Sequence, residues 1–138
     1  LFIDLDSFKQ INDQIGHEAG DAVLKETANR LCSCVRKGDT VARFGGDEFV
    51  IIMDNVRSRD DINPVVKRIL EMVARVIPFH GHDCVIGASI GISICPEHGR
   101  DVDALITNAD DAMYDIKKSG KNNYAYFDPT RPLQAAKG

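Results

Sequence analysis

The stretch ARFGGDEFVII, residues 42–52, places two glycines and two acids between two apolar segments. The flanking segments, residues 40–44 and 48–53, are rich in the β-branched and aromatic residues that favour strands. Adjacent glycines permit the tight turn that joins such strands. The sequence therefore predicts a hairpin whose tip presents Asp47 and Glu48. A turn alone requires neither carboxylate, which raises the question of a chemical role.

Outside the hairpin, apolar periodicity predicts three more strands and four helices. Alternating or continuous apolar residues predict strands over residues 1–6, 84–95 and 122–127. Apolar residues repeated at helical spacing, with Gly or Pro at the ends, predict helices over residues 7–16, 17–38, 59–77 and 101–120. The third of these helices is expected to stop at Pro78.

This order of elements, β-α-α-β-β-α-β-α-β, predicts an α+β fold. It contains a ferredoxin-like βαββαβ core with an extra helix and strand, in which helices cover a central, mainly antiparallel sheet. We expect one domain over residues 1–128 and a tail or linker over residues 129–138. The chain begins without Met in a strand-like segment, so we expect it to be an N-terminally truncated piece of a longer protein.

Composition limits the classes of function. The chain has 138 residues, 43% hydrophobic and 28% charged, and a formal net charge of −4. This charge argues against nucleic acid as a partner, because broad nucleic-acid binding requires a basic face. The four cysteines have no CxxC or zinc spacing, so we interpret them as buried, reduced thiols of a cytoplasmic domain. No apolar run approaches the length of a membrane span, although a full-length protein could be anchored through segments absent here.

Carboxylates distant in sequence are predicted to converge. The first strand ends at Asp4, Leu5 and Asp6, and in a ferredoxin-like sheet this strand neighbours the central hairpin. Oxygen ligands gathered in this way suit Mg²⁺, with substrate phosphates completing the coordination. Asp6 and Ser7 also suit the N-cap of the following helix, so for Asp6 the capping role and the site role both remain open.

The segments FIDLDSFKQINDQIGHEAGD (residues 2–21) and RFGGDEF (residues 43–49) together resemble the GGDEF domain of diguanylate cyclases. The resemblance extends from Leu1 to about Asp128, with the motifs in the family's order and spacing. It implies a fold like that of nucleotide cyclases and polymerase palm domains. It also implies an enzyme that condenses two GTP molecules into cyclic di-GMP.

Residue by residue, the resemblance implies a set of roles. Asp4, the carbonyl of Leu5 and Asp47 would bind Mg²⁺, for which Mn²⁺ could substitute, and Asp47 would also take the proton from the 3'-hydroxyl. Lys9 would stabilise charge on the phosphates. The substrate would contact Asn12, His17 and Asp21. Of these, Asn12 and Asp21 would read the guanine edge.

Basic residues near the end of the domain match the family's triphosphate-binding segment. In YDIKKSGKNN, residues 114–123, these are Lys117 and Lys121. The family often has Arg at the position of Lys121, and Lys offers a point charge where Arg offers a two-pronged fork. A basic helix end also satisfies the helix dipole without any ligand.

Arg36 and Asp39 match the RxxD motif at which cyclic di-GMP inhibits members of the family. The same pattern occurs at residues 57–60 and 100–103, but only Arg36 stands nine residues before Gly45, which is the family's register. Arginine suits contacts with guanine and phosphate. We therefore expect an inhibitory site here rather than a simple charge pair at a helix end.

The resemblance also implies partners. Because one chain carries one set of nucleotide-binding positions, catalysis would require a two-fold homodimer. A regulatory domain would precede the chain, and a phosphodiesterase domain could follow it. The alternative function is a catalytically inactive GGDEF domain that senses GTP or cyclic di-GMP for an attached domain.

Overall fold

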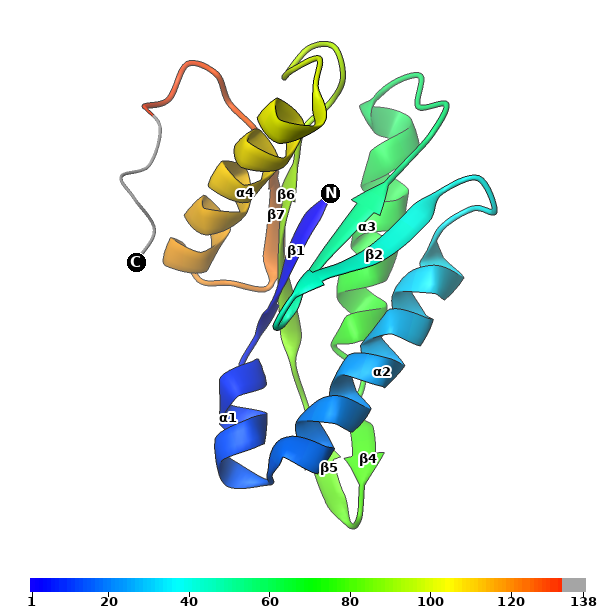
Figure 1. Cartoon of the computed structure of the whole chain (residues 1–138), viewed down its shortest axis with the longest axis vertical. Helices are drawn as coiled ribbons and strands as arrows, with labels where there is room; N and C mark the ends of the chain where they lie inside the picture. The colour runs from blue at the N-terminus through cyan, green and yellow to red at the C-terminus, as the bar shows by residue number, and fades with distance from the viewer. Residues whose placement is uncertain (133–138) are drawn as a thin grey trace.

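The computed structural model describes residues 1–132, and Figure 1 shows the arrangement of its elements. The strands are β1 (Phe2–Asp6), β2 (Thr40–Gly45), β3 (Glu48–Ile52), β4 (Ile77–Phe79), β5 (His82–Cys84), β6 (Gly87–Ile92) and β7 (Asn123–Tyr126). The helices are α1 (Phe8–Gln14), α2 (His17–Cys34), α3 (Arg59–Val73) and α4 (Val102–Lys118). Part of the predicted tail, residues 133–138, lies outside the described residues.

The main sheet has five strands in the order β2-β3-β1-β6-β7. β1 pairs antiparallel with β3 and β6, β2 pairs antiparallel with β3, and β6 and β7 are parallel. The strands β1, β2, β3 and β6 with helices α2 and α3 form the ferredoxin-like core, to which α4 and β7 are added. The predicted α+β class and mainly antiparallel sheet are confirmed.

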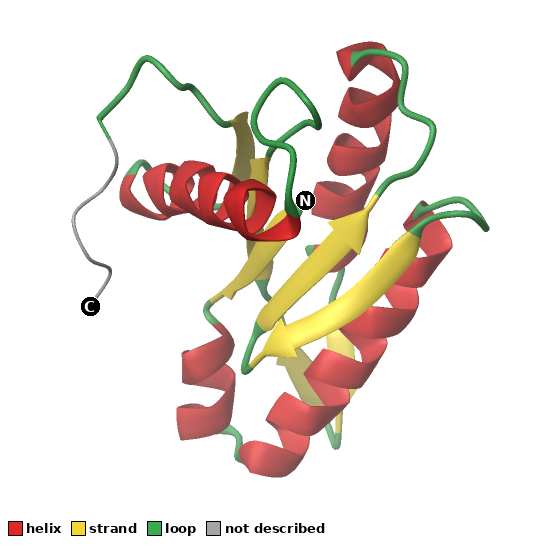
Figure 2. Ribbon diagram, turned by 45° about the horizontal axis from the view of Figure 1, so that its top comes forward, coloured by secondary structure: helices red, strands yellow, loops and turns green. Residues whose placement is uncertain are grey.

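Helices cover both faces of this sheet, with α4 on one side and α2 and α3 on the other (Figure 2). Side chains of β1 alternate between these layers because successive residues in a strand point to opposite faces. Ile3 and Leu5 belong to the large cluster that α2 and α3 cover, whereas Phe2 packs against Met113 of α4. The same alternation directs Asp4 and Asp6 to the α4 face, where Lys117 contacts both.

A small second sheet, formed by β4 and β5, was not predicted. Phe79 pairs with His82, which leaves His80 and Gly81 as a two-residue turn, and both have positive φ (46° and 82°). Positive φ at both positions is the geometry of a tight hairpin turn, usually occupied by Asn-Gly. The predicted strand over residues 84–95 is therefore wrong in its extent, because the apolar run passes from β5 into β6.

The predicted end of the third helix is also wrong. α3 ends at Val73 rather than at Ile77, and Pro78 lies in β4. The guanidinium of Arg30, on α2, donates hydrogen bonds to the carbonyls of Met72 at 2.9 Å, Arg75 at 2.7 Å and Val76 at 3.1 Å. These contacts hold the last turn of α3 and the segment before β4 against α2.

Two of the four cysteines depart from their predicted burial. Cys34 and Cys84 are buried, but Cys32 and Cys95 are exposed. Cys95 is exposed because β6 ends at Ile92, so this residue lies in the following loop. No helix within residues 1–132 combines the length and apolar character that a membrane span needs.

His98 anchors the loop between β6 and α4. Its Nδ1 accepts a hydrogen bond from the amide of Ile94 at 3.0 Å, which requires an unprotonated nitrogen. Burial lowers the pKa of His98 below its ordinary 6.5, while Glu97 opposes this shift and Arg59 reinforces it. The folded protein therefore holds His98 in its neutral form.

We expect this histidine to make the folded state less stable in mild acid. The unfolded chain takes up the proton more readily, so the contribution of His98 is complete above pH 6.5 and decreases as the pH falls below that value. Thermal unfolding from pH 7.5 to 5 should show a smaller loss of stability in His98→Asn, whose amide oxygen can still accept from Ile94. His82→Asn, at an exposed position, is the control. Equal pH slopes in His98→Asn and the wild type would contradict the prediction.

Candidate functional site

An acidic edge, formed by Asp4, Asp47 and Glu48, lies where β1 runs beside the β2–β3 turn. The strand register pairs Asp4 with Glu48, and the amide of Leu5 donates to the carbonyl oxygen of Asp47 at 3.1 Å. Because β1 lies next to β3, residues far apart in the sequence meet here. The predicted proximity of the first strand and the hairpin is confirmed.

The ammonium of Lys117, from the last turn of α4, lies against this edge. Its Nζ is 3.3 Å from the carbonyl oxygen of Leu5 and 3.5 Å from Oδ1 of Asp4. A shorter contact, 2.7 Å, joins it to Oδ1 of Asp6. One cation thus contacts oxygen atoms of three successive residues of β1.

The pKa of the Asp4 carboxyl is shifted by its surroundings. Burial raises the pKa of Asp4 from 3.8 to about 6, Lys117 opposes the rise, and the neighbouring charges of Asp47 and Glu48 add to it. Desolvation and like charges both disfavour an ionised carboxylate. A positive charge placed at the acidic edge would therefore favour the ionised form.

The carboxylate and carbonyl oxygens at this edge are suitable ligands for a divalent cation such as Mg²⁺. Carboxylate and carbonyl oxygens are its usual protein ligands, and those of Asp4 and Leu5 already converge on the ammonium of Lys117. Among residues 1–132, no group of three or more His, Cys, Asp or Glu side chains is arranged to hold a metal. The residues of the edge that could bind such a cation are Asp4, Leu5 through its carbonyl, and Asp47.

The β2–β3 turn is held by its own residues. The Nε of Arg43 donates to the carbonyl of Gly46 at 3.0 Å, and the register shifts between Arg43 and Gly45. Gly46 has a φ of 48°, which suits glycine. A Cβ at Gly45 or Gly46 would meet no atom within 4 Å, so both glycines face open space. The turn therefore leaves the approach to Asp47 clear.

Three predicted substrate-contacting residues, Asn12, His17 and Asp21, lie at the junction of α1 and α2. Asn12 is half-buried on α1, whereas His17 and Asp21 are exposed in the first turns of α2. A Cβ at Gly20 would overlap the amide of Asn12, so this glycine permits the close packing of the two helices. Within residues 1–132, no hydrogen bond or ion pair links these three side chains to one another or to the acidic edge.

The predicted phosphate-contacting lysines differ in their placement. Lys117 lies at the acidic edge, whereas Lys9 on α1 and Lys121 after α4 are exposed. Lys121 has a φ of 64°, and its amide donates to the carbonyl of Ile116 at 2.9 Å. The structure therefore brings one of the three lysines to the carboxylates and leaves the others on the surface.

Arg36 and Asp39 form a structured turn after α2. The Asp39 side chain is only 2% exposed, and its two oxygens accept from the amides of Arg36 at 2.9 Å and Asp54 at 3.0 Å. Arg36 has a side chain that is 60% exposed and donates to the carbonyl of Asp54 at 3.0 Å. A polar hollow beside the turn is lined by Arg36, Asn55, Val56, Arg57 and Asp61.

Asp6 has a role that the sequence did not reveal. The N-cap of α1 is Ser7, with a φ of 68°, but its side chain makes no capping hydrogen bond, and Asp6 is not the cap. Asp6 is instead buried and accepts hydrogen bonds from Ser89, Lys117 and Asn122. Because side chains alternate along a strand, the sequence could have placed Asp6 on the same side of β1 as Asp4. No local pattern identifies the three partners of Asp6.

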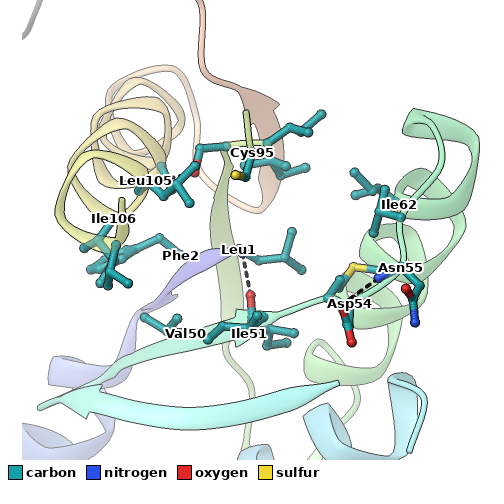
Figure 3. A pocket seen from close by; sticks show the side chains of 18 residues that line it. Leu1, Phe2, Val50, Ile51, Asp54, Asn55, Ile62, Cys95, Leu105 and Ile106 are labelled. Carbon is teal, nitrogen blue, oxygen red and sulfur yellow. Dashed lines mark hydrogen bonds between the residues drawn. The ribbon is translucent and has the colours of Figure 1, made fainter. Parts of the chain in front are cut away.

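An apolar pocket of about 460 Å³ lies at the other end of β1 (Figure 3). Leu1, Phe2 and Ile106 are among its lining residues, and Asp54 is the one lining side chain with a charge. Such a lining offers no set of acid, base and cation ligands. The acidic edge, rather than this pocket, is therefore the candidate functional site.

Comparisons with known proteins agree with the fold. A family model described as "Diguanylate cyclase, GGDEF domain" matches residues 1–123. The chain is 41% identical over 98% of its length to the bifunctional diguanylate cyclase/cyclic di-GMP phosphodiesterase MucR of Pseudomonas aeruginosa, and 37% identical over 92% of its length to the cyclic di-GMP phosphodiesterase NbdA of the same species. It spans 20% of the first protein and 16% of the second.

A solved structure is similar as well. The GGDEF domain of TpbB from Pseudomonas aeruginosa has a TM-score of 0.89 and 37% sequence identity, over 92% of this chain and 80% of that one. The sheet order defines a ferredoxin-like α+β domain, in which Asp4, Asp47 and Glu48 form an acidic edge. With the match over residues 1–123, the chain belongs to the GGDEF domain family.

Proposed function

We propose that this domain is a diguanylate cyclase, which converts two GTP molecules into cyclic di-GMP and two pyrophosphates. The observation that carries the proposal is the acidic edge, where Asp4, the Leu5 carbonyl and Asp47 meet beside the ammonium of Lys117. Membership of the GGDEF family supports it. A metal-assisted phosphoryl transfer needs oxygen ligands for the metal, and these residues offer them.

In this proposal, Asp4, Leu5 and Asp47 would hold Mg²⁺, for which Mn²⁺ could substitute. When bound, the metal would supply a lower pKa for the attacking hydroxyl and would neutralise phosphate charge. Asp47 accepts the proton of the 3'-hydroxyl. Lys117 and Lys121 hold the triphosphate, since ammonium groups pair with phosphate oxygens as point charges.

The remaining residues orient the nucleotide. Asn12 and Asp21 would bind the guanine edge, because a carboxylate can accept from two guanine N–H groups that adenine lacks. His17 would make a further substrate contact, and Lys9 would stabilise charge as it develops on the phosphates.

The chemistry is a displacement performed twice. The 3'-oxygen of one GTP bonds to the α-phosphorus of the other, the bond to the β-phosphate oxygen breaks, and pyrophosphate leaves. Asp47 takes the hydroxyl proton each time. Since one chain offers one nucleotide site, two chains related by a two-fold axis would bring the reactants together.

Turnover by the full-length protein tests the proposal. In the presence of Mg²⁺, GTP should be consumed with release of pyrophosphate, and ATP should not replace it. Omission of the divalent metal should stop the reaction. A protein that is dimeric and binds GTP tightly but releases no pyrophosphate would contradict a cyclase.

That last outcome would favour a second candidate, a catalytically inactive domain that senses GTP or cyclic di-GMP. The specific observation behind it is that NbdA, 37% identical to this chain, is named for phosphodiesterase activity alone. The chain spans only 16–20% of these two relatives, so we propose that attached domains supply the signal or a phosphodiesterase activity. We place the domain in the cytoplasm, where GTP is available.

Product inhibition at Arg36 and Asp39 is part of the proposal. The exposed guanidinium of Arg36 could contact guanine or phosphate, while Asp39 fixes the turn that presents it. Arg36→Ala should weaken inhibition by added cyclic di-GMP about tenfold or more, the expected loss for a charged hydrogen bond. Arg100→Ala, in the RxxD pattern that lacks the family register, is the control. Unchanged inhibition in Arg36→Ala would contradict this site.

A further inference from the structure

Asp6 joins three separate segments at the acidic edge. Its carboxylate lies at the end of β1, and the residue is only 4% exposed. Oδ1 accepts from the hydroxyl of Ser89 on β6 at 2.7 Å and from the ammonium of Lys117 on α4 at 2.7 Å. Oδ2 accepts from the backbone amide of Asn122 at 2.8 Å. Both oxygens of this buried carboxylate therefore have donors.

The loop that Asp6 holds has an unusual backbone. Gly120, Lys121 and Asn122 have successive φ values of 117°, 64° and 47°. Left-handed conformations at consecutive residues other than glycine are uncommon and persist only where surrounding contacts impose them. Two contacts do so here, from the amide of Lys121 to the carbonyl of Ile116 and from the amide of Asn122 to Asp6.

The neighbouring strand is also shaped to admit this contact. A Cβ on Gly87 of β6 would lie 3.0 Å from the side-chain oxygen of Asn122 and 3.2 Å from Oδ2 of Asp6. Both distances are tighter than ordinary side-chain packing, so a larger residue would displace the loop or the carboxylate. Glycine at this position leaves the contact between Asp6 and Asn122 undisturbed.

We propose that Asp6 is a positioning residue that fixes both lysines of the phosphate-binding segment relative to the acidic edge. Asp6 holds Lys117 more closely than Asp4 does, at 2.7 Å against 3.5 Å, and it fixes the backbone next to Lys121. An ammonium has three donors. Lys117 can therefore keep its bond to Asp6 and donate to a phosphate oxygen in place of one of its longer contacts, to Leu5 at 3.3 Å or to Asp4 at 3.5 Å. The inference rests on the proposed nucleotide site, because it states how that site holds its triphosphate.

A carboxylate is required because all three partners of Asp6 are donors. An ionised carboxylate offers acceptors on both oxygens, whereas the amide of asparagine must direct an NH₂ group toward one of the donors. Asp6→Asn thus preserves the size of the side chain and removes both the charge and one acceptor. Ser89→Ala is the matched control, because it removes a donor from the same carboxylate and leaves the contacts to Lys117 and Asn122 in place.

Calorimetric binding to the full-length protein tests the inference. In Asp6→Asn, the affinity for GTP with Mg²⁺ should fall about tenfold, the lower end of the usual effect of losing a supporting hydrogen bond. Affinity for guanosine, which has no phosphates, should remain that of the wild type. Ser89→Ala should bind both ligands like the wild type. Gly87→Ala crowds the same contact without removing charge, so it should weaken the binding of GTP but not that of guanosine. It replaces Asp6→Asn in the test if that variant does not fold.

Wild-type affinity for GTP in both Asp6→Asn and Gly87→Ala would overturn the inference. So would a parallel loss of GTP and guanosine binding, which would mean that Asp6 only stabilises the fold. Because these readouts are binding constants, they do not depend on turnover. A wild-type protein that binds GTP and forms no product would refute the cyclase while leaving the role of Asp6 to be decided by the variants.

Discussion

Asp47→Ala is expected to lower the rate of cyclic di-GMP formation by about 10³-fold, within the usual range for loss of a general base. The proposed metal ligand and base sits at the β2–β3 turn, and its carbonyl accepts from the amide of Leu5 whatever side chain it carries. The backbone contact between β1 and the turn should therefore survive the substitution. The rate is measured as product formed per minute at saturating GTP and Mg²⁺.

Asp83→Ala provides the control for this variant. Asp83 is an exposed acid in the hairpin of β4 and β5, away from the acidic edge. Its replacement changes the net charge by the same amount and should leave the rate unchanged. A rate for Asp47→Ala within threefold of the wild type, with unaltered thermal stability, would contradict the role given to Asp47.

The largest effect on stability is expected from Gly91→Ala. Gly91 lies in β6 under α4, and a Cβ there would overlap the carbonyl oxygen of Ala109 and the amide nitrogen of Met113. Both are backbone atoms of a helix, so neither can move aside by rotating a side chain. The free energy of unfolding should fall by about 3 kcal/mol, at the upper end of the cost of overpacking.

Urea unfolding measures this change, with Gly38→Ala as the control. A Cβ at Gly38, in the turn before β2, would meet no atom within 4 Å. Its replacement should change the free energy of unfolding by less than about 0.5 kcal/mol. Equal stabilities of the two variants would show that α4 does not lie as close to β6 as the structure indicates.

The spacing of apolar residues predicted most of the fold, because each main helix and strand repeats them at the spacing typical of its type. The hairpin around Gly46 and the amphipathic helices were predicted in order, and the pairing of β1 with β3 followed from the fold class. The end of α3 was missed because the apolar period continues to Ile77, which belongs to β4. The hairpin of β4 and β5 was missed because His80 occupies a position where asparagine is usual.

The part of the candidate site that adjacent strands bring together was predictable from the sequence. The hydrogen-bond partners that come from several separate elements were not. Asp4 and Asp47 meet because adjacent strands carry them. The partners of Asp6 come from β6, α4 and the loop before β7, and only the assembled sheet brings them together. Asp39 fits its sequence motif, yet both its oxygens bind backbone amides, a contact that spacing does not reveal.

Product identity tests the central claim most directly. The full-length protein, dimerised by fusion where its own domains do not suffice, is incubated with Mg²⁺ and GTP labelled at the α-phosphate, and the nucleotides are separated by chromatography. The label should move into cyclic di-GMP, with two pyrophosphates released for each product molecule. Label that remains in GTP, although the dimer binds it, would contradict a cyclase at the acidic edge.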